Sequence, residues 1–172
     1  WELPQYVEHD CTDADRLVEF EDLLLDSVKQ QLVADVPVGV LLSGGVDSTL
    51  TTVMACRASD EPVRTFTVGF PGHEALDESV QARGIAKYLG TQHVELMAEP
   101  ASIELLPTLA AQFDEPLGDS SLVPTYLLAK LIREHVTVAL GGDGGDELFG
   151  GYTHYRQLHQ FRFGNVLPSP LR

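Results

Sequence analysis

Apolar residues recur along the chain in two kinds of pattern, and their alternation predicts the fold. Leu17, Phe20, Leu24, Val28 and Leu32 follow one another at steps of three and four, the spacing of one apolar helix face. Elsewhere, short and nearly continuous apolar runs indicate strands that are buried on both faces, as in a parallel sheet. The predicted strands are Val36–Leu42, Val63–Phe70, His93–Met97 and Val136–Leu140.

Helical stretches lie between and after these strands. We predict helices over Ser48–Ala58, Ala75–Leu89, residues 101–113, residues 121–135 and from Glu147 to about Phe161. Strands that alternate with helices form right-handed βαβ units. The sequence therefore predicts an α/β fold, in which a parallel β-sheet is flanked by helices in a three-layer αβα sandwich. With no internal repeat or linker, residues 1–172 are expected to form a single domain.

Composition narrows the classes of function. The formal net charge of −15 disfavours binding to nucleic acid, because an acidic surface repels phosphate backbones. No apolar run is long enough to predict a membrane span. The two cysteines, Cys11 and Cys56, have no metal-ligand spacing and are expected to be reduced, which favours a cytoplasmic location. Because residue 1 is Trp and the last residues form a proline-containing tail, we expect a piece of a longer protein.

Acidic residues concentrate in residues 2–35. They could form a docking surface, but the solvated outer face of the amphipathic helix is the interpretation we favour.

The segment Ser43-Gly-Gly-Val-Asp-Ser48 follows a predicted buried strand and opens a predicted helix. It should therefore lie at the carboxyl edge of the sheet, where open α/β sheets bind ligands. Its two glycines allow backbone N–H groups to approach a ligand, its serines add hydroxyl donors, and the helix N-terminus favours an anion. Asp47 fits beside a polyphosphate if Mg²⁺ lies between them. A plain turn with Asp47 or Ser48 as helix cap is the alternative.

A second glycine-rich segment, Ala139–Tyr152, follows another predicted buried strand. Its glycines allow a tightly curved backbone, and Asp143, Asp146 and Glu147 place three carboxylates within five residues. Such carboxylates suit metal binding or general-base catalysis. A solvated surface loop is the alternative, but two carboxylate-bearing glycine turns at two strand ends favour one shared crevice.

These motifs resemble known ones. SGGVDS after an apolar strand resembles the pyrophosphate loop (PP-loop) of the N-type ATP pyrophosphatases, whose fold is of the adenine nucleotide alpha hydrolase type. The segment GGDGGDELFGGY resembles the matching stretch of glutamine-dependent asparagine synthetases. Val68-Gly69, Asp77-Glu78 and Asp114–Tyr126 agree with that family, and the resemblance covers roughly residues 14–160. It implies the C-terminal synthetase domain of the asparagine synthetase (glutamine-hydrolysing) family.

The resemblance implies roles for individual residues. The β- and γ-phosphates and the departing pyrophosphate would be held by Ser43, Gly44, Gly45, Asp47 and Ser48. Leu41 and Val68 would frame the adenine, and Gly141 and Gly142 would lie against the nucleoside. Asp47 and Asp146 would bind Mg²⁺. Asp143 would take a proton from attacking ammonia.

The resemblance also implies ATP and Mg²⁺ as cofactors and a reaction in which a carboxylate, such as aspartate, is adenylated and then amidated. Ammonia would come from glutamine through an N-terminal glutaminase domain of the same polypeptide, and a homodimer is compatible with the resemblance. This chain has Asp143 and Gly141 where many asparagine synthetases have Glu and Ser. A shorter carboxylate leaves open another acceptor, such as a sugar uronic acid or a β-lactam precursor.

Three functions thus stay open: aspartate amidation, amidation of another acceptor by the same chemistry, and nucleotide binding without catalysis. His93 and His135 are interpreted as packing or capping groups. Tyr152 and Tyr155 could be pocket walls or core, and the sequence does not decide between the two.

Overall fold

The computed structural model describes residues 11–69, 77–98, 104–115, 118–119, 121–155 and 157. Four strands form its sheet: β1 (Val38–Leu41), β2 (Arg64–Gly69), β3 (Gln92–Met97) and β4 (Val138–Leu140). All three pairings are parallel, and the strand order is β3-β2-β1-β4. Each strand lies within, or one residue beyond, the run from which it was predicted. The predicted parallel sheet is therefore confirmed.

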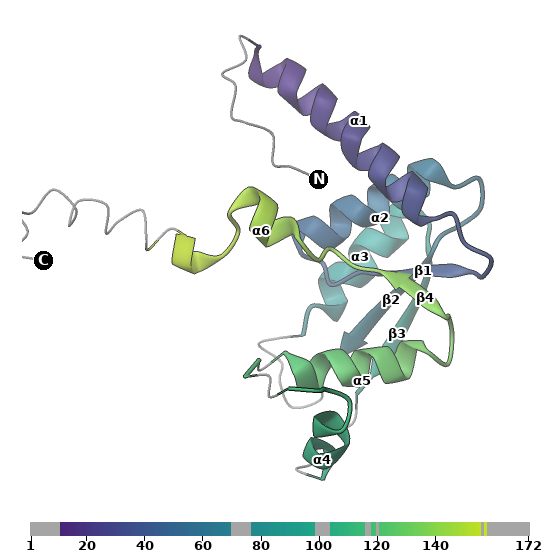
Figure 1. Cartoon of the computed structure of the whole chain (residues 1–172). Helices are drawn as coiled ribbons and strands as arrows, with labels where there is room; N and C mark the ends of the chain where they lie inside the picture. The colour runs from purple at the N-terminus through teal and green to yellow at the C-terminus, as the bar shows by residue number, and fades with distance from the viewer. Residues whose placement is uncertain are drawn as a thin grey trace, which may run out of the picture.

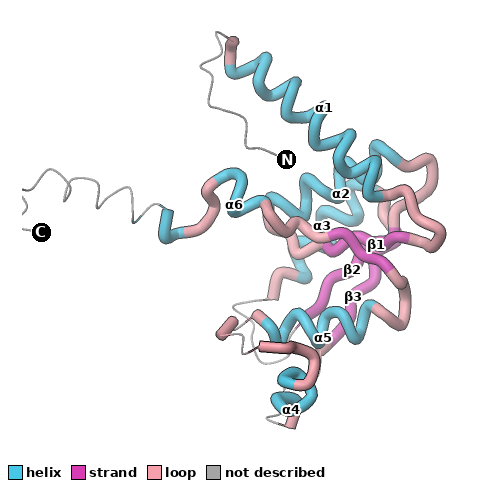
Figure 2. Tube along the Cα trace, in the orientation of Figure 1, coloured by secondary structure: helices cyan, strands magenta, loops and turns pink. Residues whose placement is uncertain are grey.

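Helices cover both faces of this sheet (Figure 1). One face packs against α1 (Asp13–Gln31), α2 (Val46–Ala58) and α3 (Ser79–Leu89), and the other packs against α5 (Leu122–Ile132). The short helix α4 (Leu105–Ala110) lies beside α5, and α6 (Gly145–Phe149) follows β4 (Figure 2). The arrangement confirms the predicted layers of helix, sheet and helix.

The core divides according to the two faces of the sheet. On the first face, Val40 of β1 is fully buried against Val28 of α1 and Met54 of α2. On the other face, Phe66 of β2 packs against Ile132 of α5 and Val136. The five residues of the predicted apolar helix face all fall in or next to α1. That helix begins with a capping box, in which Thr12 and Asp15 exchange hydrogen bonds with each other's backbone N–H groups.

All five predicted helices differ in their bounds from the observed ones: α2 begins two residues before Ser48, and α5 covers Leu122–Ile132 of the predicted 121–135. Within the described residues 104–113, the helix predicted over 101–113 consists of α4, in which Leu109 alone is buried, so little packing stabilises a longer helix. Residues 101–103, and residues 75–76 of the helix predicted over Ala75–Leu89, lie outside the described part of the chain. The helix predicted from Ala75 begins at Ser79, whose N–H donates to the carboxylate of Asp77 at 3.0 Å. Its predicted end is confirmed, because Gly90 closes α3 with a φ of 71°.

The single helix predicted from Glu147 to about Phe161 is wrong. α6 ends at Phe149 because Gly150 adopts a φ of 69°, the left-handed conformation that terminates helices. Helical backbone resumes at residues 153–155, and residues beyond 157 lie outside the described part of the chain.

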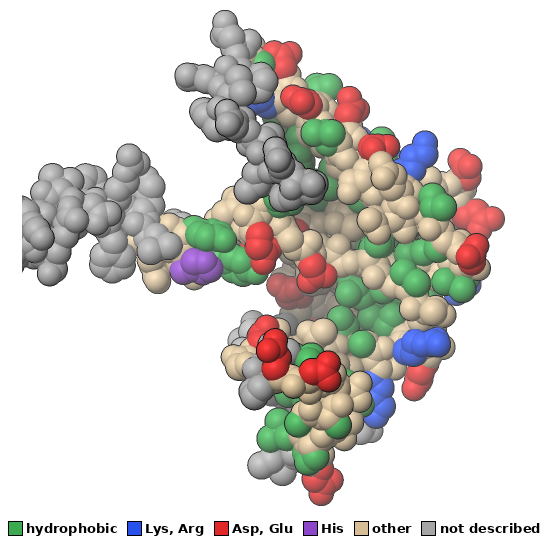
Figure 3. All heavy atoms as spheres, in the orientation of Figure 1, with side chains coloured by type: hydrophobic (Ala, Val, Ile, Leu, Met, Phe, Trp, Pro, Cys, Tyr) green, Lys and Arg blue, Asp and Glu red, His purple; other side chains and the backbone are tan. Residues whose placement is uncertain are grey.

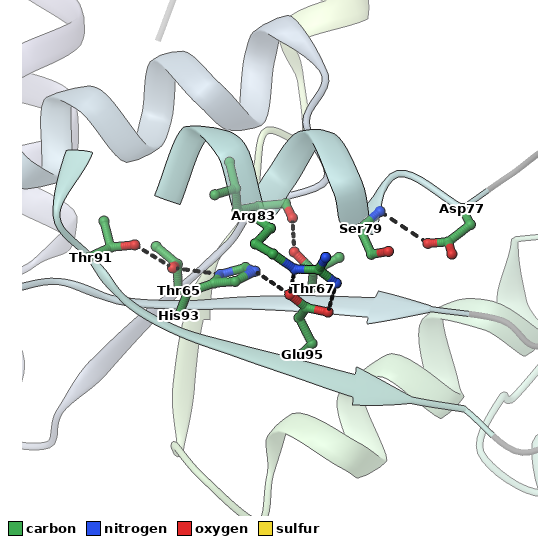
Figure 4. Close-up of polar contacts among 9 residues, drawn as sticks. Thr65, Thr67, Asp77, Ser79, Arg83, Thr91, His93 and Glu95 are labelled. Carbon is green, nitrogen blue, oxygen red and sulfur yellow. Dashed lines mark hydrogen bonds and ion pairs between the residues drawn. The ribbon is translucent and has the colours of Figure 1, made fainter. Parts of the chain in front are cut away.

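α3 is attached to the edge strand β3 by a polar network (Figure 4). Arg83 of α3 donates to both carboxylate oxygens of Glu95, at 2.5 and 2.6 Å. His93 Nδ1 lies 3.0 Å from the hydroxyl of Thr65, which also pairs with Thr91. Burial lowers the pKa of His93, although the nearby Glu95 carboxylate opposes this effect. His93 is thus a packing group on β3 that contacts β2 through Thr65, as interpreted from the sequence.

Candidate active site at the carboxyl ends of β1 and β4

The strand order places β1 and β4 side by side while the chain continues from β1 to β2 on the opposite side. Parallel sheets bind ligands at such a switch point, outside the carboxyl ends of the two strands. Both glycine-rich segments begin there, because one follows β1 and the other follows β4.

The loop after β1 is braced by its own serines. The Ser48 hydroxyl accepts from the Ser43 N–H and donates to the Gly45 carbonyl, each at 3.2 Å. The two serine hydroxyls lie 2.9 Å apart, and Gly45 N–H donates to the Ser43 hydroxyl. Gly45 is the N-cap of α2 and makes no side-chain cap hydrogen bond. An anion at the loop would meet the N–H groups of the first turn of this helix.

Gly44 has a φ of 93°, so only glycine adopts this conformation without strain. A Cβ at this position would lie 2.8 Å from Cβ of Gln81 on α3. The absence of a side chain at Gly44 therefore allows the loop to pack closely against α3.

The second loop packs directly on the first. A Cβ at Gly142 would lie 2.8 Å from the backbone nitrogen of Ser48 and 3.0 Å from the Asp47 Cβ. A Cβ at Gly145 would lie 2.5 Å from the Asp47 carboxylate. Gly142 requires glycine, because side-chain atoms there would meet the backbone of the first loop and push the loops apart, whereas a side chain at Gly145 would first displace the Asp47 carboxylate. The crevice expected from the sequence is thus present, with Asp47 at the contact between the loops.

A cavity of about 530 Å³ opens at this contact. Ten of the eleven residues predicted from the sequence line it: Leu41, Ser43, Gly45, Asp47, Ser48, Val68, Gly141, Gly142, Asp143 and Asp146. The eleventh, Gly44, faces α3. The structure therefore brings the two sets of predicted residues together around one cavity.

The cavity has an apolar side and an acidic side. Leu41 and Val68 lie at the carboxyl ends of β1 and β2, and Phe66 lies in the middle of β2. Pro124 and Leu128 of α5 line the same cavity. Carboxylates come from Asp47, Glu78, Asp143, Asp146 and Glu147, whereas no Lys, Arg or His lines the cavity among the described residues. In Figure 3, acidic side chains edge the hollow between α5 and α6, and the basic ones visible in that view lie away from it.

Glu147 and Tyr152 form a pair at the cavity. The Tyr152 hydroxyl donates to the Glu147 carboxylate at 2.6 Å. This hydrogen bond raises the pKa of Tyr152 to about 12 and lowers the pKa of Glu147. Because Tyr152 also lines the cavity, it is a pocket wall and not a core residue, the two alternatives that the sequence left open for it.

The cavity is also lined by residues to which the sequence assigned no role in the site: Phe66, Thr67, Glu78, Pro124, Thr125 and Leu128. Glu147 and Tyr152, which the sequence offered as a candidate carboxylate and a possible pocket wall, line it as well. Pro124, Thr125 and Leu128 reach the cavity only because α5 crosses that face of the sheet, for which the sequence carries no local signal.

The carboxylates can take part in binding a hard cation, which prefers oxygen ligands. Among the residues that the structure describes, no three or more His, Cys, Asp or Glu side chains lie close enough together to hold a metal by themselves. Asp47 and Asp146 line the same cavity, and a Mg²⁺ site commonly takes one or two carboxylates together with phosphate oxygens and water.

The 141–145 loop has a second, apolar hollow on its other side. This hollow measures about 260 Å³ and is lined by α1, α2 and α6, including Leu24, Val28 and Leu148. Phe20 of α1 and Phe149 of α6 meet edge to face beside it, with ring centroids 5.3 Å apart. The loop that carries Asp143 is thus a wall shared by two hollows.

Other features bear on the class of protein. Cys11 and Cys56 are both free thiols, as expected. Within the described ranges, no helix combines the length and apolar character of a membrane span.

Solved structures with the same fold include the glutamine-dependent NAD⁺ synthetase of Acinetobacter baumannii in complex with ADP. It matches with a TM-score of 0.54 at 19% identity, over 87% of this chain and 30% of that one. The NH₃-dependent NAD synthetase of Campylobacter jejuni matches with a TM-score of 0.50 at 19% identity, over 78% and 60%. These likenesses confirm the predicted fold, that of the adenine nucleotide alpha hydrolase type.

Closer relatives carry a family name. The chain is 39% identical over 163 residues to asparagine synthetase (glutamine-hydrolyzing) 1 of Bacillus subtilis, over 94% of this chain and 26% of that protein. It is 30% identical over 165 residues to asparagine synthetase B of Escherichia coli, over 83% and 29%. The chain thus spans only about a quarter to a third of these relatives' length. A sequence profile described as asparagine synthase matches residues 19–169, so the chain belongs to the asparagine synthase family.

Proposed function

We propose that this chain is the nucleotide-binding part of an enzyme that amidates a carboxylate through an acyl-adenylate, releasing AMP and pyrophosphate. The observation that carries the proposal is the direct contact of two glycine-rich loops around one cavity at the switch point of the sheet. Family membership supports ATP as the nucleotide and aspartate as the acceptor. In the complete enzyme, ammonia would be released from glutamine by a glutaminase domain.

The residues divide the work according to their place in the cavity. Ser43, Ser48 and the N–H groups at the start of α2 would bind the β- and γ-phosphates. The apolar side at Leu41 and Val68 would hold the adenine ring, and Gly141 and Gly142 would lie against the nucleoside. Asp47 and Asp146 would hold Mg²⁺, which neutralises phosphate charge when bound.

The chemistry would proceed in two steps. A carboxylate oxygen of the acceptor attacks the α-phosphorus, and the bond to pyrophosphate breaks. Ammonia then attacks the acyl carbon, AMP leaves with the electron pair of the broken C–O bond, and Asp143 accepts the proton that nitrogen loses. The chain's contribution is alignment of the reacting groups together with charge neutralisation.

Calorimetric titration of this chain with ATP, with and without Mg²⁺, tests the proposal. We expect Mg²⁺-dependent binding that Asp47→Asn weakens at least about tenfold, since a charge-assisted contact contributes roughly 1.5–3 kcal/mol. Asp60→Asn is the matched control, because Asp60 is exposed beyond the opposite end of the same helix. An ATP affinity that changes neither on adding Mg²⁺ nor in Asp47→Asn would refute the phosphate-loop assignment.

A further inference from the structure

The phosphate loop, residues 43–48, rests on two supports. The first is β2, because the Leu42 N–H donates to the Phe66 carbonyl at 2.9 Å and the Leu42 carbonyl accepts from the Thr67 hydroxyl. The second is the N-terminal half of α3, which the loop approaches so closely at Gly44 that no side chain fits between them. The position of α3 on the sheet therefore affects where the loop lies.

Apolar packing provides little of what holds α3 in place. Its buried residues are Ala82 and Ala86, which form a cluster with Leu42 and the partly buried Ile85. Alanine side chains bury little apolar surface, and hydrophobic stabilisation scales with the area that is buried. A charged contact can therefore contribute a substantial share of the interaction that fixes this helix on the sheet.

Arg83, the residue after Ala82, makes such a contact (Figure 4). Its guanidinium donates two hydrogen bonds to the Glu95 carboxylate, at 2.5 and 2.6 Å, and so joins α3 to the edge strand β3. The Asp77 carboxylate, two residues before the helix, attracts the same guanidinium. The Arg83 side chain is 59% exposed and the Glu95 side chain 31%, so solvent weakens the pair without removing it.

His93 does not compete for Glu95 at neutral pH. Its Nε2 is buried, lies 3.9 Å from the Glu95 carboxylate and has no hydrogen-bond partner within the described part of the chain. The charged groups that face this ring are Glu95 on its own strand and Arg83 on α3, whereas β2 presents the Thr65 hydroxyl. Because burial lowers the pKa of His93, the ring is neutral at pH 7.5, and Glu95 pairs with Arg83.

We propose that the Arg83–Glu95 ion pair positions the phosphate loop by holding α3 against β3. The inference rests on the proposed function and deepens it, because it extends the phosphate site to residues that do not touch the nucleotide. Neither Arg83 nor Glu95 lines the cavity, so each is a positioning residue that acts through α3 and Gly44. Loss of the pair should weaken binding of the β- and γ-phosphates and leave binding at the adenosine end of the cavity unchanged.

Calorimetric titrations at pH 7.5 with two probes, Mg-ATP and AMP, test this inference. Arg83→Met, which keeps an apolar stem, and Glu95→Gln should each weaken Mg-ATP binding about two- to fivefold, the range of a partly exposed ion pair. The affinity for AMP, which lacks the β- and γ-phosphates, should stay at the wild-type value. Because both changes break the same pair, the double variant should bind Mg-ATP no more weakly than either single variant.

Lys87→Met and Arg57→Met are matched controls. Lys87 lies in the last turn of α3, so its replacement removes a positive charge from the same helix without breaking the pair. Arg57 of α2 forms an ion pair of comparable exposure with Glu21 of α1, so its replacement breaks a pair that does not involve α3. Both control variants should bind Mg-ATP like the wild type.

Four results would overturn the inference: wild-type Mg-ATP affinity in Arg83→Met, an equal loss of affinity for AMP, a loss in the double variant equal to both single losses combined, or the same loss in Arg57→Met. In each case, Mg-ATP binding by the wild-type chain leaves the proposed function standing. A wild-type chain that binds no Mg-ATP refutes the proposed function and this inference together.

Discussion

Gly142 offers the sharpest test of the contact between the two loops. In Gly142→Ala the new methyl group would lie 2.8 Å from the Ser48 backbone nitrogen and 3.0 Å from the carbonyl carbon and Cβ of Asp47. These neighbours belong to the first turn of α2 and have no flexible end that could move aside. One loop must therefore shift, and inserting an extra methyl group into a packed site typically costs about 1–3 kcal/mol.

For a chain of this size, each kcal/mol moves the melting temperature by about 2–4 °C, so Gly142→Ala should lower it by roughly 2–12 °C. Because the shift separates Asp47 from the second loop, the affinity for Mg-ATP should fall at least about tenfold in the same variant. Thermal unfolding followed by circular dichroism and calorimetric titration measure the two effects.

Gly84→Ala is the matched control. Gly84 lies inside α3, and a Cβ there would meet nothing within 4 Å. Alanine is favoured over glycine in a helix interior by about 0.5–1 kcal/mol, so this variant should melt roughly 1–4 °C higher and bind Mg-ATP normally. If Gly142→Ala melted and bound like the wild type, the two loops would not be packed as described, and the reasoning from close approach would be wrong.

Three further variants test other parts of the structure. Ser48→Ala removes a buried hydroxyl that braces the loop, and should lower the free energy of unfolding by about 1–3 kcal/mol in urea titrations. Gly39→Ala places a methyl group 2.6 Å from the buried ring of Phe66 and should lower the melting temperature without changing the Mg²⁺ dependence of ATP binding. His93 has a lowered pKa in the folded chain, so the unfolded chain binds more protons and stability should fall as pH drops below about 6.5. His93→Gln should abolish this loss between pH 7.5 and 5.5 in urea titrations, whereas an unchanged pH dependence would contradict the assignment.

Local patterns were sufficient to predict the strands and the residues at their ends. An apolar run that stops at Ser43 or Gly141 is itself the signal for a strand followed by a loop, and parallel strands bring those loops to one edge. Nothing local indicates that α5 supplies the wall with Pro124 and Leu128, since this depends on which face of the sheet the helix crosses.

The error at α6 has a related cause. The predicted helix runs through two adjacent glycines, Gly150 and Gly151, although the left-handed conformation of Gly150 ends α6. That turn is what carries Tyr152 to Glu147, so the same error concealed the pair at the cavity. A glycine pair that precedes an aromatic residue is a helix-ending signal that the sequence did carry.

The pairing of β1 with β4 has a consequence for the order of folding. Val38 lies opposite Val138, one hundred positions later in the chain, whereas β2 and β3 follow β1 through short crossovers. Closing the longest loop costs the most chain entropy, so we expect β1, β2 and β3 to associate first and β4 to dock last. During synthesis the early strands also leave the ribosome before β4 does. The cavity between the two loops then comes into existence only with the final docking step, and a bound nucleotide would stabilise specifically the state in which folding is complete.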